Sequence, residues 1–572
     1  AGGTVTDSGT LTITEATTIN ASNQNVELDE PASNFVGAVG ITGANVAVRD
    51  VGAIVLGPST VSGTYTVTAA GAVTDGATGE LDIEGVTTIS ASNQTVTLDH
   101  SASDFTGAVV ITAENVAVTD VNGIDLGTST VTGTYTVNAG GTVTDSGTLT
   151  ITGATTINAS NQNVELDESA SNFVGAVSIT GKNVEVTDAN TIELGTSTIT
   201  GTYEVTATAG DITDNGVLTI TSAATFRAAA GQNIILNNNN IFSSAVSFTT
   251  PSGNLKDVTI TDTTDFDLVT LTLSGDLAVI SGGSITQSGA LTIGGISSFT
   301  TSTNNKTIDL STITTNAFTG AITITTNDDS GTDADVAIDG GTTKLVIAAS
   351  TVDGDLTLRT GNADGITDSG TVTVGGNLIV DNDVSNGDIN MDSLAVDGTI
   401  ALATIGSGGN VTLVNDAGLD FAASTIGGDL NATATTLNIS DSGTLTVTGT
   451  TIITLGTNPI LSVSGATSAT DLDGFTITLD TANNLFTGGI TLRYENVLPP
   501  DDNSDIDLAR KVVFAELIRG LYKNIKNIYG AYEDINEDDI RRMYELFLQS
   551  LPNSKQEFKE VKINLSNKLK IR

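Results

Sequence analysis

The feature that most constrains this chain is an internal repeat with a period of about 70 residues. The segment beginning Val5-Thr6-Asp7-Ser8-Gly9 returns almost unchanged at Val143 and again at Ile439. Looser copies begin at Val73, Ile212, Ile285 and Ile366, and the interval between the last two is longer than the others. Seven units therefore fill residues 1–498. Self-similarity at a fixed period is typical of solenoids, propellers and arrays.

Within each unit, short segments alternate apolar with polar residues and are separated by Gly, Asn, Asp and Ser. The first unit shows this at Val26/Leu28, Val46/Val48 and Tyr65/Val67. Such alternation predicts strands with one buried face, and the units show no helical periodicity. Dividing a unit by three gives turns of about 23 residues, the size of one rung of a parallel β-helix. We therefore predict a mainly β fold for residues 1–499: a right-handed parallel β-helix (β-solenoid) of about 21 rungs.

Composition supports a narrow core and excludes several functions. The chain has no Trp or Cys, one His and 4% aromatic residues, so Val, Ile, Leu and Ala must fill the interior. Its net charge of −45 would repel a phosphate backbone, so we expect no nucleic-acid partner. No apolar run is long enough to form a transmembrane segment. The chain starts with Ala1 inside a repeat, and we expect it to be a segment of something longer.

Residues 500–572 differ from the repeats in charge and in pattern. They hold 13 of the 21 basic residues of the chain, and apolar residues recur at helical spacing in two segments before a strand-like end. We predict a small, mainly helical (α+β) C-terminal module. One interpretation is a cap that seals the last rung. The other is a recognition, anchoring or assembly module, with a partner contact formed by Tyr522, Tyr529, Tyr532 and Tyr544.

Two acidic segments are candidates for calcium, because carboxylates at alternate positions can ring this ion. The first contains Asp328, Asp329, Asp333 and Asp335 and lies in the long interval between Ile285 and Ile366. The second contains Asp501 and Asp505, where the alternative is the cap of a helix. For the first segment the alternative is a solvated turn. Calcium is the only cofactor that the sequence indicates, and no catalytic residue is predicted.

Two further features have structural interpretations. The recurring Thr-Asp-Ser-Gly element, with Asp7, Asp145 and Asp368, and with Asp441 where Ser replaces the Thr, is explained by local Asx turns. His100 stands where two other units have Glu30 and Glu168, and we interpret it as sequence drift at a turn rather than a catalytic base.

The repeats resemble those of very large bacterial surface proteins of the filamentous-haemagglutinin type. The resemblance rests on the segment Leu194-Gly195-Thr196-Ser197-Thr198-Ile199-Thr200-Gly201-Thr202-Tyr203, followed by Asp-Ser-Gly-Thr-Leu-Thr-Ile and Asn-Val-Glu-Leu-Asp. It covers residues 1–497, and residues 501–572 match no family known to us. It implies export by a partner transporter and a role as an adhesin or matrix component.

Two main hypotheses about function follow. In the first, the chain is a non-enzymatic extracellular or cell-surface rod, adhesin-like or structural, whose partner is a host or neighbouring cell surface. In the second, copies of the chain assemble end to end through the C-terminal module into an extracellular filament, sheath or surface layer. A polysaccharide-acting β-helix enzyme is a third possibility, although acid pairs are so common here that they identify no site.

Overall fold

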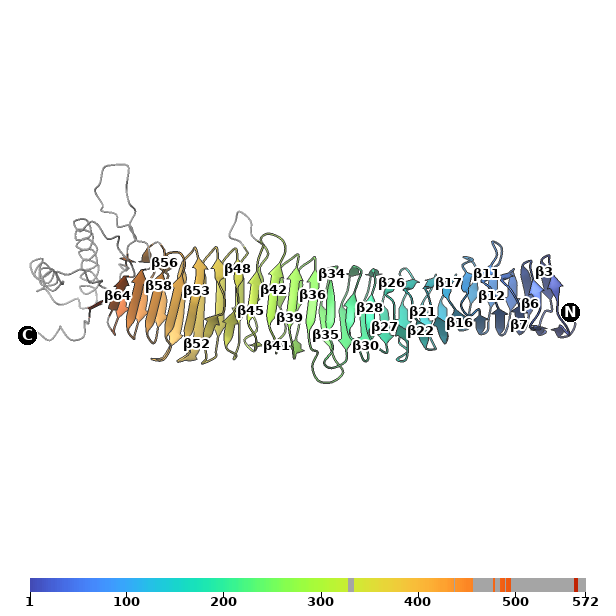
Figure 1. Cartoon of the computed structure of the whole chain (residues 1–572), viewed down its shortest axis with the longest axis horizontal. Helices are drawn as coiled ribbons and strands as arrows, with labels where there is room; N and C mark the ends of the chain where they lie inside the picture. Colours follow the sequence, from blue (N-terminus) through green and yellow to red (C-terminus); the bar gives the residue numbers. More distant parts are fainter. Residues whose placement is uncertain are drawn as a thin grey trace, which may run out of the picture. The chain divides into compact units, whose positions relative to one another are not determined.

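The fold was analysed in a computed structural model that describes residues 1–327, 334–436, 438–455, 477–478, 484–488, 490–494 and 560–563. The chain divides into two compact units, Ala1–Val279 and Ile280–Arg572, which we call the N-terminal unit and the C-terminal unit. The secondary structure of the described residues consists of strands, with no helix among them. Figure 1 shows the strands of each unit side by side in chain order.

In the N-terminal unit, each turn of the chain adds a strand segment to each of two long parallel sheets. The first sheet contains β1 (Val5–Thr6), β4 (Val26–Leu28), β7 (Val46–Asp50), β10 (Tyr65–Ala69), β13 (Thr87–Ser90), β16 (Val109–Ala113), β18 (Ile124–Leu126), β19 (Ser129–Val131), β21 (Val143–Asp145), β22 (Leu149–Ile151), β24 (Val164–Leu166), β25 (Asn172–Phe173), β27 (Val184–Asp188), β30 (Tyr203–Ala207), β33 (Ala224–Ala228), β35 (Val246–Thr249) and β37 (Phe266–Leu268). The second sheet contains β3 (Thr17–Asn20), β6 (Val39–Gly43), β8 (Ile54–Leu56), β9 (Ser59–Val61), β11 (Val73–Asp75), β12 (Leu81–Ile83), β14 (Thr95–Leu98), β15 (Asp104–Phe105), β17 (Asn115–Asp120), β20 (Tyr135–Ala139), β23 (Thr155–Asn158), β26 (Val177–Gly181), β28 (Ile192–Leu194), β29 (Ser197–Ile199), β31 (Ile212–Asp214), β32 (Leu218–Ile220), β34 (Ile234–Phe242) and β36 (Val258–Asp262). Three short strands lie outside these sheets: β2 (Thr12–Ile13), β5 (Asn34–Phe35) and β38 (Leu271–Leu273).

The C-terminal unit has the same plan. Its first sheet contains β40 (Ile285–Gln287), β43 (Ile308–Leu310), β46 (Val336–Asp339), β49 (Leu356–Thr360), β52 (Leu378–Ser385), β54 (Ile400–Ile405), β56 (Leu419–Phe421), β57 (Ser424–Ile426), β59 (Ile439–Asp441), β60 (Leu445–Val447), β62 (Ile477–Thr478) and β63 (Leu485–Phe486). Its second sheet contains β42 (Ser297–Thr301), β45 (Ile322–Thr325), β47 (Leu345–Ile347), β48 (Ser350–Val352), β50 (Ile366–Asp368), β51 (Val372–Val374), β53 (Ile389–Val396), β55 (Val411–Asn415), β58 (Leu430–Ala434), β61 (Thr451–Leu455), β64 (Ile490–Tyr494) and β65 (Glu560–Ile563). A short pair is formed by β41 (Leu291–Ile293) and β44 (Ala317–Phe318), and β39 (Leu277–Ser281) spans the boundary between the units.

The strand register gives the length of one turn. In the first sheet of the N-terminal unit, Val5 pairs with Val26, Val26 with Val46, Val46 with Tyr65, and Tyr65 with Thr87. One turn therefore takes about 20 residues, and the pairing is parallel and in register. The predicted parallel β-solenoid is confirmed for the part of the chain that the structure describes.

The sequence repeat and the turn do not coincide in the way we predicted. In the N-terminal unit, copies of the repeat begin at β1, β11, β21 and β31, which lie alternately in the first and the second sheet. The C-terminal unit repeats this alternation with β40, β50 and β59. Each repeat therefore spans three and a half turns, so the division of a repeat into three turns was wrong. Successive repeats present the same residues on opposite faces of the solenoid.

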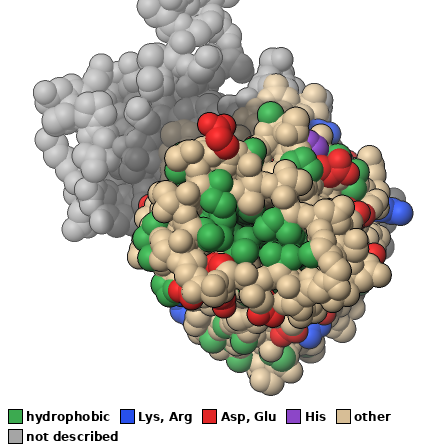
Figure 2. Space-filling model, turned by 90° about the vertical axis from the view of Figure 1, so that its right-hand side faces the viewer, with side chains coloured by type: hydrophobic (Ala, Val, Ile, Leu, Met, Phe, Trp, Pro, Cys, Tyr) green, Lys and Arg blue, Asp and Glu red, His purple; other side chains and the backbone are tan. Residues whose placement is uncertain are grey.

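The core is a narrow column of aliphatic side chains, with buried aromatic side chains at intervals along it. Along β10, Tyr65, Val67 and Ala69 are buried while Thr66 and Thr68 point outward. The largest fully buried side chains include Tyr65, Tyr135 and Tyr203, which occupy one position of the repeat. Figure 2 looks onto the first turn, where apolar side chains fill the centre and polar atoms surround them. Burial of each such side chain contributes about 1.5–3 kcal/mol, so stability accumulates turn by turn.

The extra residues of the long interval between Ile285 and Ile366 lie in one enlarged turn. Ile308 of β43 pairs with Val336 of β46, and this step along the chain is longer than the next one, from Val336 to its partner Leu356. The predicted insertion is therefore present. The predicted boundary between residues 499 and 500 lies outside the described residues, as do the helices predicted after it. Of that module the structure describes β65, which falls in the segment that alternates like a strand.

Candidate functional site

The predicted calcium segments are only partly within the described residues. Asp328, Asp329, Asp333, Asp501 and Asp505 lie outside them. Asp335 is exposed, and its Oδ1 accepts a hydrogen bond from the backbone N–H of Asp355 at 2.8 Å. In the described part of the chain, no group of three or more His, Asp or Glu side chains is arranged to hold a metal ion. The calcium site stays a prediction.

The other singled-out side chains have separate outcomes. Tyr522, Tyr529, Tyr532 and Tyr544 lie outside the described residues, so their predicted contact role stays a prediction. His100 follows β14, and its backbone N–H donates to Asp75 Oδ2 at 2.9 Å while its Nδ1 accepts from the N–H of Ala102 at 3.4 Å. These contacts belong to a turn between strands.

The Thr-Asp-Ser-Gly aspartates bond the next turn of the solenoid rather than their own. Asp368 Oδ1 and Oδ2 accept the N–H groups of Asp392 and Ser393 at 3.1 and 2.7 Å. Asp145 Oδ1 accepts the N–H of Asp167 at 3.0 Å. The local Asx turn we predicted was therefore the wrong explanation. Because the strands end at this corner, the backbone of the next turn lacks a carbonyl partner, and the carboxylate supplies the acceptor.

A second set of aspartates is buried and joins turns from inside. Asp188, at the end of β27, is 0% exposed. Its Oδ2 accepts the N–H of Phe173 at 2.7 Å and its Oδ1 accepts the N–H of Asn190 at 2.6 Å. The same two bonds recur at Asp50 and Asp120. Asp50 and Asp188 lie in the first sheet and Asp120 lies in the second, so both sheets carry such an aspartate. We call each of these three buried aspartates, with its two backbone hydrogen bonds, a staple.

Buried hydroxyl groups close the remaining gaps in the ladders. Where β6 passes from pairing with β8 to pairing with β9, the N–H of Ile41 donates to Ser59 Oγ at 3.1 Å. Ser59 in turn donates to the carbonyl of Gly57 at 2.9 Å. The same pair of bonds is repeated at Ser129 and Ser197. The buried polar residues of these positions therefore serve the backbone, as buried polar groups in folded proteins generally do.

Burial changes the pKa of several of these aspartates. Burial raises the pKa of Asp145 to about 6, against the lowering effect of the backbone N–H groups of Asp167 and Glu168. Burial also raises the pKa of Asp120 and Asp188, while their backbone hydrogen bonds lower it. In each case loss of hydration outweighs the hydrogen bonds. Since the same atoms hold neighbouring turns together, these shifts have a structural cause.

One outward-facing ladder carries like charges. Glu165 of β24 pairs with Glu185 of β27, which pairs with Glu204 of β30. The pKa of Glu185 is raised by partial burial and then by the charges of Glu204, Asp167 and Glu165. Among the described residues, no Lys or Arg forms an ion pair with these glutamates. Like charges directly opposite each other destabilise a sheet, so this ladder costs stability at neutral pH.

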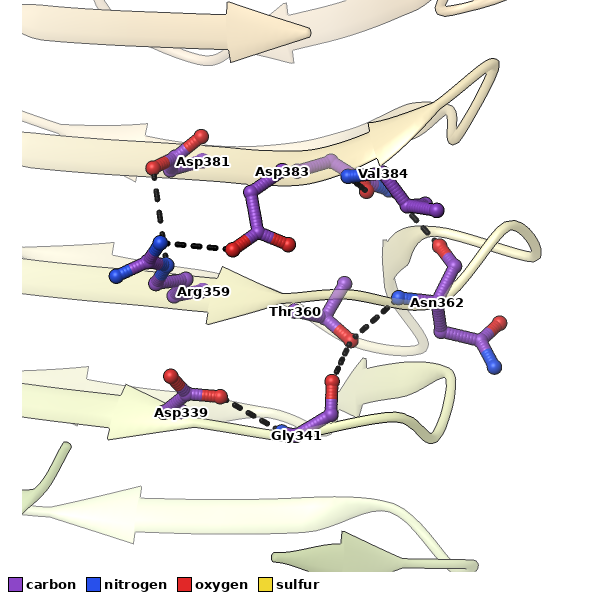
Figure 3. A network of polar contacts seen from close by, with 9 residues as sticks. Asp339, Gly341, Arg359, Thr360, Asn362, Asp381, Asp383 and Val384 are labelled. Carbon is purple, nitrogen blue, oxygen red and sulfur yellow. Dashed lines mark hydrogen bonds and ion pairs between the residues drawn. The ribbon is translucent and has the colours of Figure 1, made fainter. Parts of the chain in front are cut away.

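A second ladder places one cation among several carboxylates. On the first sheet of the C-terminal unit, Arg359 of β49 pairs in register with Asp339 of β46 and Asp381 of β52. Its Nη2 lies 2.7 Å from Asp383 Oδ2 and its Nε lies 3.9 Å from Asp381 Oδ2 (Figure 3). Asp339 is turned toward the backbone N–H of Gly341, at 2.7 Å. The guanidinium is thus paired with carboxylates of its own chain.

Comparison with known proteins adds a family. The model of a family described as repeats of unknown function (DUF5649) matches residues 1–42, 43–112, 113–180, 181–249, 255–325, 333–404 and 408–461. The chain belongs to this family. Its seven DUF5649 repeats agree with the seven units found by self-similarity. No curated protein and no solved structure matches the chain. No helix of the described residues has the length and apolar character needed to span a bilayer.

Proposed function

We propose that this chain of DUF5649 repeats is a non-enzymatic extracellular bacterial surface rod, either adhesin-like or a structural component of a matrix. The observation that carries the proposal is the placement of each repeat on three and a half turns. Because successive repeats alternate between the two sheets, the outward residues of the repeat appear on both faces. A surface that repeats its chemistry on opposite sides suits a spacer or a multivalent scaffold.

The polar chemistry of the described residues supports the same proposal. A glycan-cleaving site requires an acid and a base at a defined separation in one groove. Here the buried aspartates are occupied by backbone N–H groups of adjoining segments, and Arg359 is occupied by Asp383. Turnover of acidic or neutral glycans by the purified chain would overturn the proposal.

The charge of the chain favours separate molecules. A net charge of −45 repels other copies at low ionic strength and keeps an acidic surface hydrated. The resemblance to filamentous-haemagglutinin-type repeats supports an extracellular or cell-surface location. The alternative in which copies assemble end to end is retained as an outcome of the test.

The test measures adhesion and assembly on the full chain. Fluorescent beads coated with the chain are washed over epithelial and bacterial cell layers, beside beads coated with a variant carrying Tyr522→Ser, Tyr529→Ser, Tyr532→Ser and Tyr544→Ser. Loss of the aromatic contacts should reduce retention about tenfold, while hydrogen exchange of the solenoid stays unchanged. Equal retention of both bead types, or of beads coated with an unrelated acidic protein, would contradict the adhesive role. Ordered polymers in negative stain would favour the filament.

A further inference from the structure

The last described strand of the solenoid is covered by a strand of opposite direction. β64 pairs in parallel with β61 on one side, with Thr451 opposite Ile490 and Leu455 opposite Tyr494. On its other side, β65 pairs with it antiparallel, with Ile490 opposite Ile563 and Arg493 opposite Glu560. Within each unit the other strand pairs that the structure describes are parallel. This pairing therefore ends the pattern of the solenoid.

The strand that β65 covers is longer than the last described strands of the first sheet. The first sheet ends in β62 and β63, which have two residues each, whereas β64 has five. Very short edge strands offer little to another chain, but a longer edge strand presents a row of free N–H and C=O groups that another strand can pair with. The antiparallel strand fills the longer edge and leaves the two short ones.

The direction of β65 matters as much as its presence. A solenoid grows when a further turn pairs in parallel and in register with the last one. An antiparallel strand has a different hydrogen-bond pattern, so a parallel turn of a second copy cannot continue the ladder at the same positions. The chain between Tyr494 and Glu560 is also long, so no tight hairpin forces this pairing.

We propose that Glu560–Ile563 is an edge cap, which keeps the terminal turn from pairing with the sheet edge of a second copy of this chain. The partner that the uncapped edge fits is another strand of the same fold, recognised through its backbone. This inference does not depend on the adhesive function proposed above.

The test uses two proline variants of the full chain. Proline removes a backbone N–H, and in an antiparallel pair the N–H groups of neighbouring residues point to opposite sides of the strand. Of Val561→Pro and Lys562→Pro, one therefore removes a hydrogen bond to β64 and the other removes an outward N–H, so each variant is the matched control of the other. Oligomeric state is measured by light scattering over a range of concentrations, and hydrogen exchange is followed at Ile490–Tyr494.

We expect faster exchange at Ile490–Tyr494 and concentration-dependent self-association in one variant, with the other closer to the parent chain. Truncation after Lys559 should give the same self-association without introducing proline. This variant tests the edge cap even if the two proline substitutions have the same effect. Unchanged exchange at Ile490–Tyr494 after truncation would overturn the proposal, because β65 would not cover the edge. Faster exchange with a strictly monomeric protein would also overturn it, because the open edge would not recruit a second copy. Polymers of the parent chain joined at this end would overturn it as well.

Discussion

Replacement of Asp188 by asparagine tests the buried staples most sharply. The carboxylate is fully buried and accepts two backbone N–H groups, from Phe173 and from Asn190, at 2.7 and 2.6 Å. Asparagine keeps one acceptor oxygen and turns an NH₂ group toward the other donor. One buried N–H is then left without an acceptor, which costs about 1–3 kcal/mol.

A competing effect acts in the opposite direction. Burial raises the pKa of Asp188, so its charged form is less favourable in the fold than in water, and a neutral side chain relieves that cost. This relief is smaller than the cost of turning the NH₂ group of asparagine toward a buried backbone N–H, because neither donor then has an acceptor. We therefore expect net destabilisation by Asp188→Asn at pH 7, and a larger loss for Asp188→Ala, which removes both acceptors.

Hydrogen exchange is the appropriate assay, because a solenoid can open locally rather than in one cooperative step. A cost of about 1–3 kcal/mol corresponds to roughly 5- to 150-fold faster exchange at Phe173 and Asn190. Asp82→Asn is the matched control, since Asp82 is exposed on β12 and its loss removes the same charge. The staple account is refuted if Phe173 exchanges at the parent rate in Asp188→Asn, or if the control accelerates it equally.

Three further outcomes follow from the ladders and corners. Glu185→Gln should raise the melting temperature at pH 7, because it removes a charge that lies between two like charges. Each such pair costs roughly 0.2–1 kcal/mol. Glu27→Gln is the control and should leave the melting temperature unchanged, because the neighbours of Glu27 across the sheet are Thr6 and Ala47. The folded state raises the pKa of Asp145 to about 6 from its usual value near 3.8, so it binds a proton that the unfolded chain releases; stability from this group is fully present below pH 4 and is lost as pH rises through 6. Melting curves between pH 4 and 8 should show a shallower pH dependence in Asp145→Asn, and an identical slope would contradict the assignment. Gly341→Ala should destabilise the C-terminal unit by about 1–3 kcal/mol, because φ is +60° and a Cβ there would meet the carbonyl of Asn316, while Gly9→Ala, with open space around it, should be neutral in thermal melts.

The sequence predicted the class of fold well because the same residue pattern recurs in every repeat. Alternation of apolar and polar residues in one unit is weak evidence, but its recurrence in seven units left a stacked solenoid as the consistent solution. The buried and outward positions along β10, from Tyr65 to Ala69, follow the alternation directly. The enlarged turn before Val336 could also be located, because an insertion lengthens the spacing between copies.

The number of turns in a repeat was missed because a whole number was assumed. Nothing requires one repeat to return the chain to the sheet where it started, and a half turn places the next copy on the opposite face. The spacings from Val26 to Val46 and from Val46 to Tyr65 indicated the length of one turn, since each of these residues begins a similar strand. Both spacings are shorter than a third of the repeat.

The buried aspartates were missed because acidic residues near turns are ordinarily assigned to solvent. The alternation itself contained the correction. In the segment from Val184 to Asp188, the inward positions are Val184, Val186 and Asp188, so the aspartate continues the buried series. The partner of the Asp188 carboxylate, Phe173, lies in the preceding turn, and only the register of the turns reveals it.

Cysteine cross-linking tests the central claim most directly, namely that each repeat takes three and a half turns and one turn takes about 20 residues. The chain has no native cysteine, so introduced pairs report without background. Ala117 and Thr156 are the in-register neighbours of Thr136 on the second sheet. Oxidation should therefore join Thr136→Cys to Ala117→Cys and, in a separate variant, to Thr156→Cys. Efficient joining of Thr136→Cys to a cysteine at Ala113 or Ala159, which turns of one third of a repeat would bring opposite it, would contradict the account.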